Sequence, residues 1–290
     1  MIYGAARGQT ARDIERTLGY DDIQDVHQYY KDFYQQNNDY NWAYGVYVDQ
    51  DYSIQESYQR LIQSYYQSPV SKVDFDNGEE VRREINEMLY YLSAAYYGGS
   101  LKYHSGQTYT GQFYNYGDRD SQVKYWTLKG PIYYYYSQDY KAVRIPYYDN
   151  EYLSLMVVVP ERYEGLDQLK EYFSYKTYSH IWSQMYQEDV EVQIPEFKLD
   201  YYQPLSDVLQ HAGFQDIFRE GADFSGMSGE LYVSQVGHRA YFEMEEPSSD
   251  YSPHHHSSSG RTVKVDRPFV FYVVDHRTGM IYYSGYFSQF

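Results

Sequence analysis

The sequence predicts an α+β fold with largely antiparallel sheets, and two observations lead to that prediction. Apolar residues recur at helical spacing through much of the first 90 residues. Alternating or continuous apolar runs, which are typical of strands, dominate the later part and make up almost everything after Leu231. No repeat of fixed period is present. Helices that come early and strands that come late favour an α+β arrangement over a doubly wound parallel sheet.

The predicted helices lie mainly before residue 90. Thr10 and Asp13 form a capping-box pattern ahead of Ile14 and Leu18, and Gly19 marks the end of that helix. The complete set of predicted helices is 10–18, a looser segment at 24–36, 53–66 after a second capping box, 79–89 after the turn at 76–78, a short one at 166–173, and 204–213.

The predicted strands carry the rest of the chain. They are 42–49, 70–75, much of a β-like stretch at 90–136, then 143–145, 153–159, 190–199, 231–245, 262–274 and 280–287. The run at 153–159 is apolar throughout, so we expect it to be buried on both faces. A polar stretch at 247–260 and a turn at 275–279 separate the last strands.

Charge and cysteine content exclude several classes of function. The 290-residue chain has a formal net charge of −17, which disfavours binding to nucleic acid and to anionic lipid. Cysteine is absent, which excludes disulfides, thiolate nucleophiles and cysteine-ligated metal sites. No apolar run is long enough to cross a bilayer, and the first residues lack the pattern of a signal peptide. We therefore predict no nucleic-acid partner and no membrane insertion.

Tyrosine is unusually abundant, with 43 residues in the chain. Tyrosine rings suit a core if their hydroxyl groups find partners, so one interpretation is that they fill core and half-buried positions. The other interpretation is that tyrosine has its own purpose, such as packing between chains or oxidative cross-linking. The run at 133–136 would place two rings on each face of a strand.

Motifs for enzyme chemistry are mostly missing. The sequence has no H-E-x-x-H motif, no phosphate-binding glycine loop and no G-x-S-x-G motif. The segment 74–78 only faintly resembles a calcium loop and is better explained as a turn. His254, His255 and His256 are a weak candidate for a divalent metal, and an exposed polar loop is the alternative. We predict neither an enzyme nor a cofactor.

An ordered set of short motifs runs along nearly the whole chain. The motifs are 4–11, Ile14, 18–20, 73–75, 79–82, Ile85, Asn86, 192–199, Leu209, 213–214, 222–228, 231–234, 238–240, Glu243, 245–246, 266–269, Asp275, 278–279 and Gly285. Each motif is weak alone, but their order and approximate spacing resemble the serpin family of protease inhibitors.

This resemblance implies one domain over 1–290 with three β-sheets and eight or nine helices, without the further N-terminal segment that family members carry. It also implies a reactive loop, here 247–264, which an inhibitory member exposes as bait for a protease. After cleavage such a loop inserts into the large sheet as a new strand, and the protease stays trapped as an acyl-enzyme. By resemblance, the hinge and the point where the sheet opens fall at Glu245, Glu246, His238 and Ser93. The family has asparagine in place of Ser93 and tryptophan in place of Leu101.

The reactive loop departs from the inhibitory pattern of small residues. Its notable residues are Pro247, Ser248, Asp250, Tyr251, Pro253, Ser259, Gly260 and Arg261. The two prolines cannot donate hydrogen bonds in a central strand, and Asp250 or Tyr251 would have to enter a tight sheet. The loop is also about ten residues shorter than usual in the family, which shortens its reach by about 30 Å.

Two functions remain open. The first is a secreted, non-inhibitory protein with a structural, storage or binding role, whose tyrosine-rich surfaces assemble it into a homo-oligomer or filament. The alternative is a working inhibitor of a serine or cysteine protease that uses the short loop, with Arg261 as the residue at the cleavage site. In that case the partner is a protease. The family resemblance implies an extracellular location.

Overall fold

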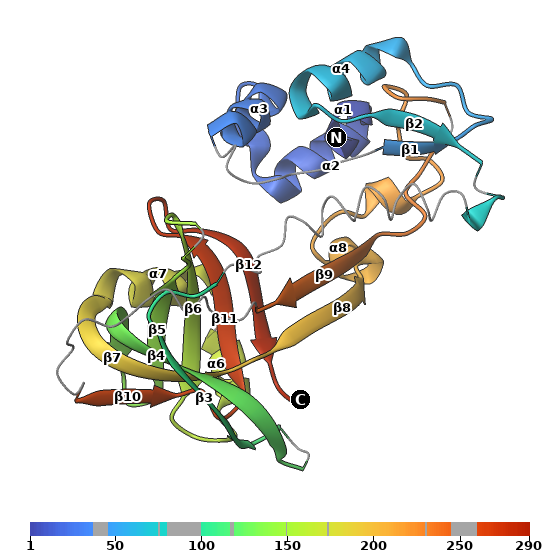
Figure 1. The fold of residues 1–290 in the computed structure, drawn as a ribbon. Coiled ribbons are helices and arrows are strands. Elements are labelled where there is room, and N and C mark those ends of the chain that lie inside the picture. The colour runs from blue at the N-terminus through green and yellow to red at the C-terminus, as the bar shows by residue number, and fades with distance from the viewer. Residues whose placement is uncertain are drawn as a thin grey trace. The chain divides into compact units, whose positions relative to one another are not determined.

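The computed structural model describes residues 1–36, 46–74, 76–79, 100–116, 119–148, 150–172, 174–229, 231–244 and 260–290. The chain forms two compact units, which Figure 1 shows as ribbons. The first unit comprises 1–96 and 200–241, and the second comprises 97–199 and 242–290. One cooperative domain over 1–290 stays a prediction.

The first unit contains most of the described helices. They are α1 (Ile2–Ala5), α2 (Gly8–Leu18), α3 (Val26–Gln36), α4 (Glu56–Tyr66) and α8 (Ser206–His211), with short 3-10 helices at Tyr20–Asp22 and Asp216–Phe218. The strands β1 (Val46–Asp49) and β2 (Val70–Val73) pair in parallel. The predicted helix at 79–89 and the first part of the predicted strand at 42–49 lie outside the described residues.

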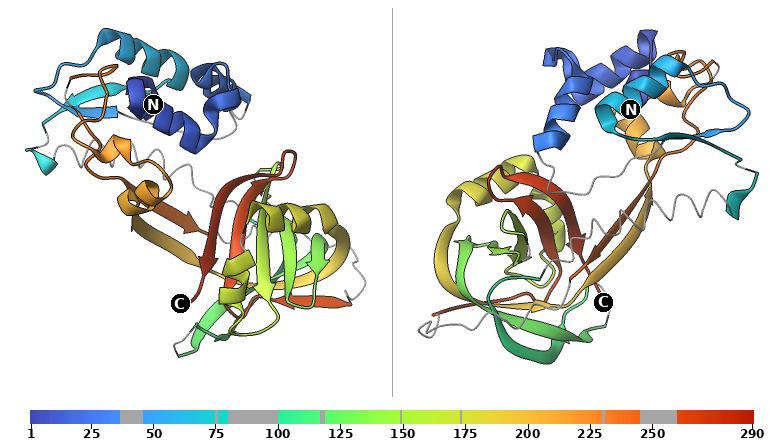
Figure 2. Two further views of the ribbon diagram at one scale, coloured as in Figure 1. Left: turned by 180° about the vertical axis from the view of Figure 1, so that it is seen from behind. Right: turned by 45° about the horizontal axis from the view of Figure 1, so that its top comes forward.

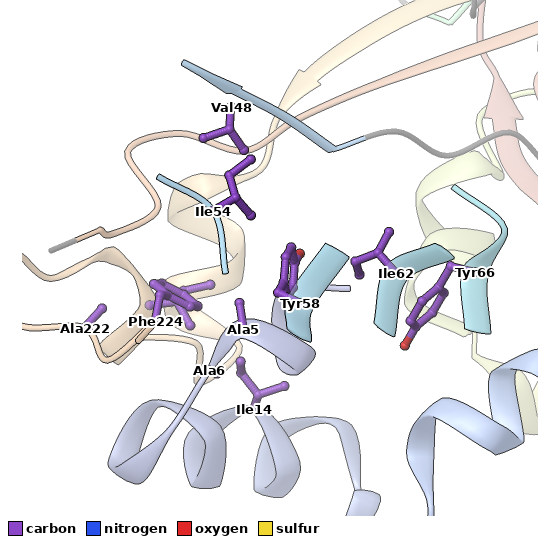
Figure 3. Close-up of a cluster of buried hydrophobic side chains, with 11 residues drawn as sticks. Ala5, Ala6, Ile14, Val48, Ile54, Tyr58, Ile62, Tyr66, Ala222 and Phe224 are labelled. Atoms are coloured by element: carbon purple, nitrogen blue, oxygen red, sulfur yellow. The ribbon is translucent and has the colours of Figure 1, made fainter. Parts of the chain in front are cut away.

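Segments from distant parts of the sequence share the core of the first unit. Ile14 of α2, and Tyr58 and Ile62 of α4, belong to the same buried cluster as Phe224 (Figure 3). The other buried members are Ala5, Ala6, Val48, Ile54, Tyr66, Ile217 and Ala222. The N-terminal helices therefore bury their apolar faces only together with the segment 200–241.

The helix α2 begins earlier than the sequence predicts. It starts at Gly8, after Arg7 as the N-cap residue, and no side chain caps it. The hydroxyl group of Thr10 instead donates to Asp216 and accepts from the backbone N–H of Asp223 at 2.8 Å. The predicted capping residue thus makes a tertiary contact, whereas Gly19 ends the helix as predicted, with φ of 68°.

A second two-stranded sheet pairs β8 (Lys198–Pro204) with β9 (Gly237–Glu243). Each of these strands contains a point at which the chain passes from one unit to the other. The strand β9 starts at Gly237, six residues later than the predicted strand 231–245. Pro204 ends β8, so the helix predicted from Pro204 starts at Ser206 instead.

The second unit contains an eight-stranded sheet with the order β10-β7-β4-β5-β6-β11-β12, to which β3 adds by pairing with β4. The strands are β3 (His104–Phe113), β4 (Ser121–Tyr136), β5 (Tyr140–Pro146), β6 (Leu153–Pro160), β7 (Tyr186–Pro195), β10 (Arg261–Lys264), β11 (Phe269–Asp275) and β12 (Met280–Phe287). Its pairs are antiparallel except β10 with β7, which is parallel. The predicted strand at 262–274 is therefore two strands.

The two faces of this sheet pack against different parts of the second unit. On one face, α6 (Leu166–Tyr172) and α7 (Tyr175–Gln184) pack against alternate residues of β5, β6 and β11 (Figure 2). The sequence did not predict α7. The phenylalanines 269 and 271 of β11 instead contact Phe197 of the β7–β8 connection. Every residue of β6 is buried, as its apolar run predicted.

The predicted fold class is confirmed. The described residues form seven α-helices and three sheets, in which antiparallel pairs dominate. None of the described helices is long and apolar enough to span a membrane.

Tyrosine is found both in the core and at the surface. Tyr134 is 3% exposed, whereas Tyr136, two residues further along β4, is 52% exposed. Tyr133 and Tyr135, on the opposite face of the strand, are half-buried. The structure therefore fits the interpretation that tyrosines fill core positions, and it also leaves many tyrosine rings at the surface.

Candidate functional site

The candidate site is the segment between β9 and β10, which the sequence predicts to be the reactive loop. Most of its predicted residues lie outside the described part of the chain: Glu245, Glu246, Pro247, Ser248, Asp250, Tyr251, Pro253, His254, His255, His256 and Ser259. Ser93 of the predicted opening point lies outside it as well. The described residues of the site are Met244 at its N-terminal end, Gly260 and Arg261 at its C-terminal end, and His238.

The N-terminal end of the segment is fixed by aromatic packing. Phe242 stacks on Phe197 with ring centroids 5.0 Å apart, and both side chains are buried. The backbone N–H of Met244, the next buried residue, donates to the carbonyl group of Phe197 at 3.3 Å. The segment therefore starts from a point that is held against Phe197 of the second unit.

The C-terminal end is fixed by the sheet and by an ion pair. Arg261 begins β10 and lies opposite Val190 of β7 in a parallel pair. Its Nε atom lies 2.8 Å from Oε2 of Glu188, and its guanidinium carbon lies 5.1 Å from the centroid of the Tyr134 ring. The interaction with Glu188 raises the pKa of Arg261. Gly260, just before it, is exposed.

This geometry bears on the prediction that Arg261 is the cleavage-site residue. A protease binds its substrate as an extended segment with free backbone groups. Arg261 has its backbone in the sheet register with β7 and its side chain on Glu188, although that side chain is still 46% exposed. The structure therefore places Arg261 as the residue that anchors the segment in the sheet.

The remaining predicted residues are not brought together in the described part of the chain. His238 is an exposed residue of β9, and its predicted neighbour Ser93 falls outside the described residues. Leu101, which stands where the family has tryptophan, is 3% exposed and forms a β-bridge with Tyr147. No cluster of three metal-ligating side chains occurs within the described residues.

Sequence reasoning missed the residues that hold the anchor. Glu188 lies on β7, more than 70 positions before Arg261 in the sequence. Tyr134 lies on β4, which comes earlier still. Neither residue belongs to a motif, so only the strand register brings them to Arg261.

The comparisons with known proteins agree with this architecture. The model of the family described as serpin (serine protease inhibitor) matches residues 1–89 and 87–289, so the chain belongs to the serpin family. Iripin-8 of Ixodes ricinus is 28% identical, over 98% of this chain and 83% of its own length. Intracellular coagulation inhibitor 1 of Tachypleus tridentatus is 27% identical, over 100% and 81%. The leukocyte elastase inhibitor of Equus caballus is 25% identical, over 100% and 89%.

Solved structures show the same fold. A tumour-suppressing serpin superposes with a TM-score of 0.84 at 21% identity, over 99% of this chain and 88% of the other. Uncleaved ovalbumin gives the same TM-score at 19% identity, over 99% and 89%. The alignment with Iripin-8 extends over 340 positions, whereas this chain has 290 residues. The alignment therefore contains gaps in this chain.

The predicted family is thus confirmed, and one expectation is corrected. The expected secreted, extracellular location rested on the family resemblance alone. Two of the similar relatives from Tachypleus tridentatus are named intracellular coagulation inhibitors. Membership of the family therefore does not imply secretion, and the expectation is wrong.

Proposed function

We propose that this chain is a protease inhibitor that presents the segment 245–260 as bait and holds its target without inserting that segment into a sheet. The support for inhibition is that the two relatives named above as inhibitors match almost the whole chain. The support for the bait is its position, because the segment joins two ends that the second unit holds firmly, Met244 and Arg261.

The composition of the segment argues for a mode without insertion. It contains Pro247 and Pro253, which lack the N–H group that a central strand uses for its ladder. The two held ends remove part of the chain entropy that binding to a protease would otherwise cost. The bait then acts as a slowly released ligand.

The test is incubation of the full chain with trypsin-like, elastase-like and cysteine proteases. Residual protease activity measures inhibition, and a denaturing gel with mass spectrometry locates any cleaved bond. We expect reversible inhibition of at least one protease, cleavage only within 245–260, and no complex that survives denaturation. A variant with 247–259 replaced by a glycine–serine segment of equal length should lose the inhibition.

Arg261→Gln is the matched control. Because the backbone of Arg261 pairs with β7 whatever its side chain, and Glu188 engages that side chain in the parent chain, we expect this variant to inhibit as well as the parent chain. Loss of inhibition of trypsin-like proteases in Arg261→Gln would instead identify Arg261 as the cleavage-site residue that the protease recognises. Failure of every protease to bind would contradict inhibition altogether.

The second candidate function is a non-inhibitory structural, storage or binding role through self-association. One observation favours it: many tyrosine side chains of the described residues are exposed by more than a third. In the second unit they are Tyr109, Tyr116, Tyr136, Tyr148, Tyr163, Tyr175, Tyr186 and Tyr286. Tyrosine supplies large contact area with a hydroxyl group at low entropic cost, as interfaces require.

A further inference from the structure

Arginine side chains of the second unit stack repeatedly on aromatic rings. Within the described residues the arginine–tyrosine pairs are Arg144 on Tyr133 at 4.0 Å, Arg261 on Tyr134 at 5.1 Å, Arg267 on Tyr163 at 3.9 Å, and Arg277 on Tyr152 at 3.7 Å, from guanidinium carbon to ring centroid. Such stacking places the cation on the ring face, where the two groups attract each other and the cation is shielded from water.

All but one of these arginines also have a carboxylate partner. Their ion pairs are Arg261 with Glu188 at 2.8 Å, Arg267 with Asp266 at 2.8 Å, and Arg277 with Asp275 at 2.7 Å. Arg144 forms no ion pair with any carboxylate in the described part of the chain, although only 9% of it is exposed. Its Nε atom is buried without a hydrogen-bond partner.

The guanidinium group of Arg144 lies between two elements. Arg144 stands on β5 directly opposite Tyr133 of β4, whose phenol also interacts with it. From the other element, α7, the centroid of the Trp182 ring lies 4.2 Å from the guanidinium carbon. Arginine stays charged even when buried, so the site holds a positive charge that no carboxylate of the described residues neutralises.

The surroundings add positive charge. Partial burial lowers the pKa of His276, and the nearby Arg144, Arg277 and Lys102 lower it further, while the carboxylate of Asp275 acts in the opposite direction. The carboxylate of Asp275, in the same turn, is engaged by the side chain and backbone N–H groups of Arg277. It therefore does not serve as the counter-ion of Arg144.

The geometry points to Arg144 as the anchor of a binding site for a small organic carboxylate. A carboxylate accepts the free Nε–H donor in the charge-assisted geometry that arginine favours. An apolar or aromatic body on the ligand would then rest against the rings of Trp182 and Tyr133. Trp182 is half-buried on a helix of this unit, and the proposal requires that its side chain move to let the carboxylate reach the buried Nε atom.

The experiment titrates the full chain with sodium benzoate at constant ionic strength and follows heat of binding and melting temperature. Sodium phosphate and sodium chloride are the competing probes. We expect saturable binding of benzoate, with a rise in melting temperature that phosphate and chloride do not match. Arg144→Met, which keeps the volume and removes the charge, should weaken benzoate binding at least about tenfold.

Arg261→Met is the matched control, because it removes a stacked arginine that already has a carboxylate partner; it should bind benzoate like the parent chain. Arg144→Lys keeps the charge but not the planar fork, and should bind benzoate only weakly. Equal binding by Arg144→Met, equal effects of all three anions, or no saturation would each overturn the assignment. The melting temperature of Arg144→Met without ligand shows independently that the variant folds.

Discussion

The guanidinium group of Arg7 occupies the space that a side chain at position 226 would need: a β-carbon on Gly226 would lie 2.5 Å from Arg7 Cζ. The guanidinium group cannot move away freely, because its Nη1 atom donates to the carbonyl groups of Gly4 at 3.0 Å and Ala6 at 2.7 Å. This contact ties the N-terminal helices to the segment 222–228 of the same unit.

Gly226→Ala should therefore destabilise the protein by about 1–3 kcal/mol, the usual cost of overpacking a tight contact. Denaturant unfolding measures the change in the free energy of unfolding. Gly221→Ala is the matched control, since nothing lies within 4 Å of a β-carbon there, and it should change stability little. Equal stability of the two variants would show that Arg7 moves aside at no cost.

Cleavage of the reactive loop should produce no large gain in heat stability. Insertion of the segment would place Pro247 and Pro253 in a central strand and bury Asp250 or Tyr251. Calorimetry of intact and loop-cleaved protein measures the difference in melting temperature. A rise of tens of degrees would show that the loop inserts and would refute the proposed mode.

Limited proteolysis should cut first within 247–261. This stretch is polar and bounded by Pro247, and such segments are preferred sites of nicking. Mass spectrometry of early fragments identifies the cut. The one-domain prediction also expects a single cooperative unfolding transition, and early cutting near residue 150 into stable halves would contradict it.

Alkaline pH should unfold the protein through its buried tyrosines. Burial raises the pKa of Tyr58 to about 12. An unfolded tyrosine ionises near pH 10, so the stability that Tyr58 contributes is present below about pH 10 and is lost as the pH rises toward 12. Tyr58→Phe removes this loss and should retain about 1 kcal/mol more stability at pH 11, relative to neutral pH, than the parent chain.

Circular dichroism across pH 8–12 follows unfolding, and phenolate absorbance follows ionisation. Tyr175→Phe is the control, because Tyr175 is 77% exposed and its replacement should leave the stability unchanged. An identical pH midpoint for Tyr58→Phe and Tyr175→Phe would contradict the role of Tyr58.

Self-association through exposed tyrosines should appear as salt is raised. The net charge of −17 opposes assembly at low ionic strength, and salt screens it within about 8 Å. Light scattering at tens of micromolar protein and about 0.15–0.5 M salt should then detect oligomers. A constant monomer mass across that range would exclude the second candidate function in its self-assembling form.

The sequence predicted those elements whose signal is local. Gly19 ends α2 because the left-handed conformation favours glycine, and the apolar run of β6 is buried throughout. It did not predict that Thr10 bonds to Asp216, because that contact depends on segments 206 positions apart. The helix α7 was missed because its first residues, Tyr175 to Tyr178, lack clear apolar spacing.

The site was less predictable than the fold for the same reason. Arg261 was visible as the only lysine or arginine in the stretch 247–263, but its partner Glu188 becomes apparent only through the register of β10 on β7. Arg144 gives no signal at all, since it stands between Val143 and Ile145 in an ordinary apolar strand. Only the structure shows that Arg144, unlike Arg261, Arg267 and Arg277, has no carboxylate partner among the described residues.

The divided sequence of the first unit has a consequence for synthesis on the ribosome. Ile14 and Tyr58 leave the exit tunnel long before Phe224, the residue with which they share a core. At about 5–20 residues per second, that interval is on the order of 10 s. During this time the apolar faces of the first helices have no permanent cover within the nascent chain. Ribosome-associated chaperones therefore have a defined period in which to bind them.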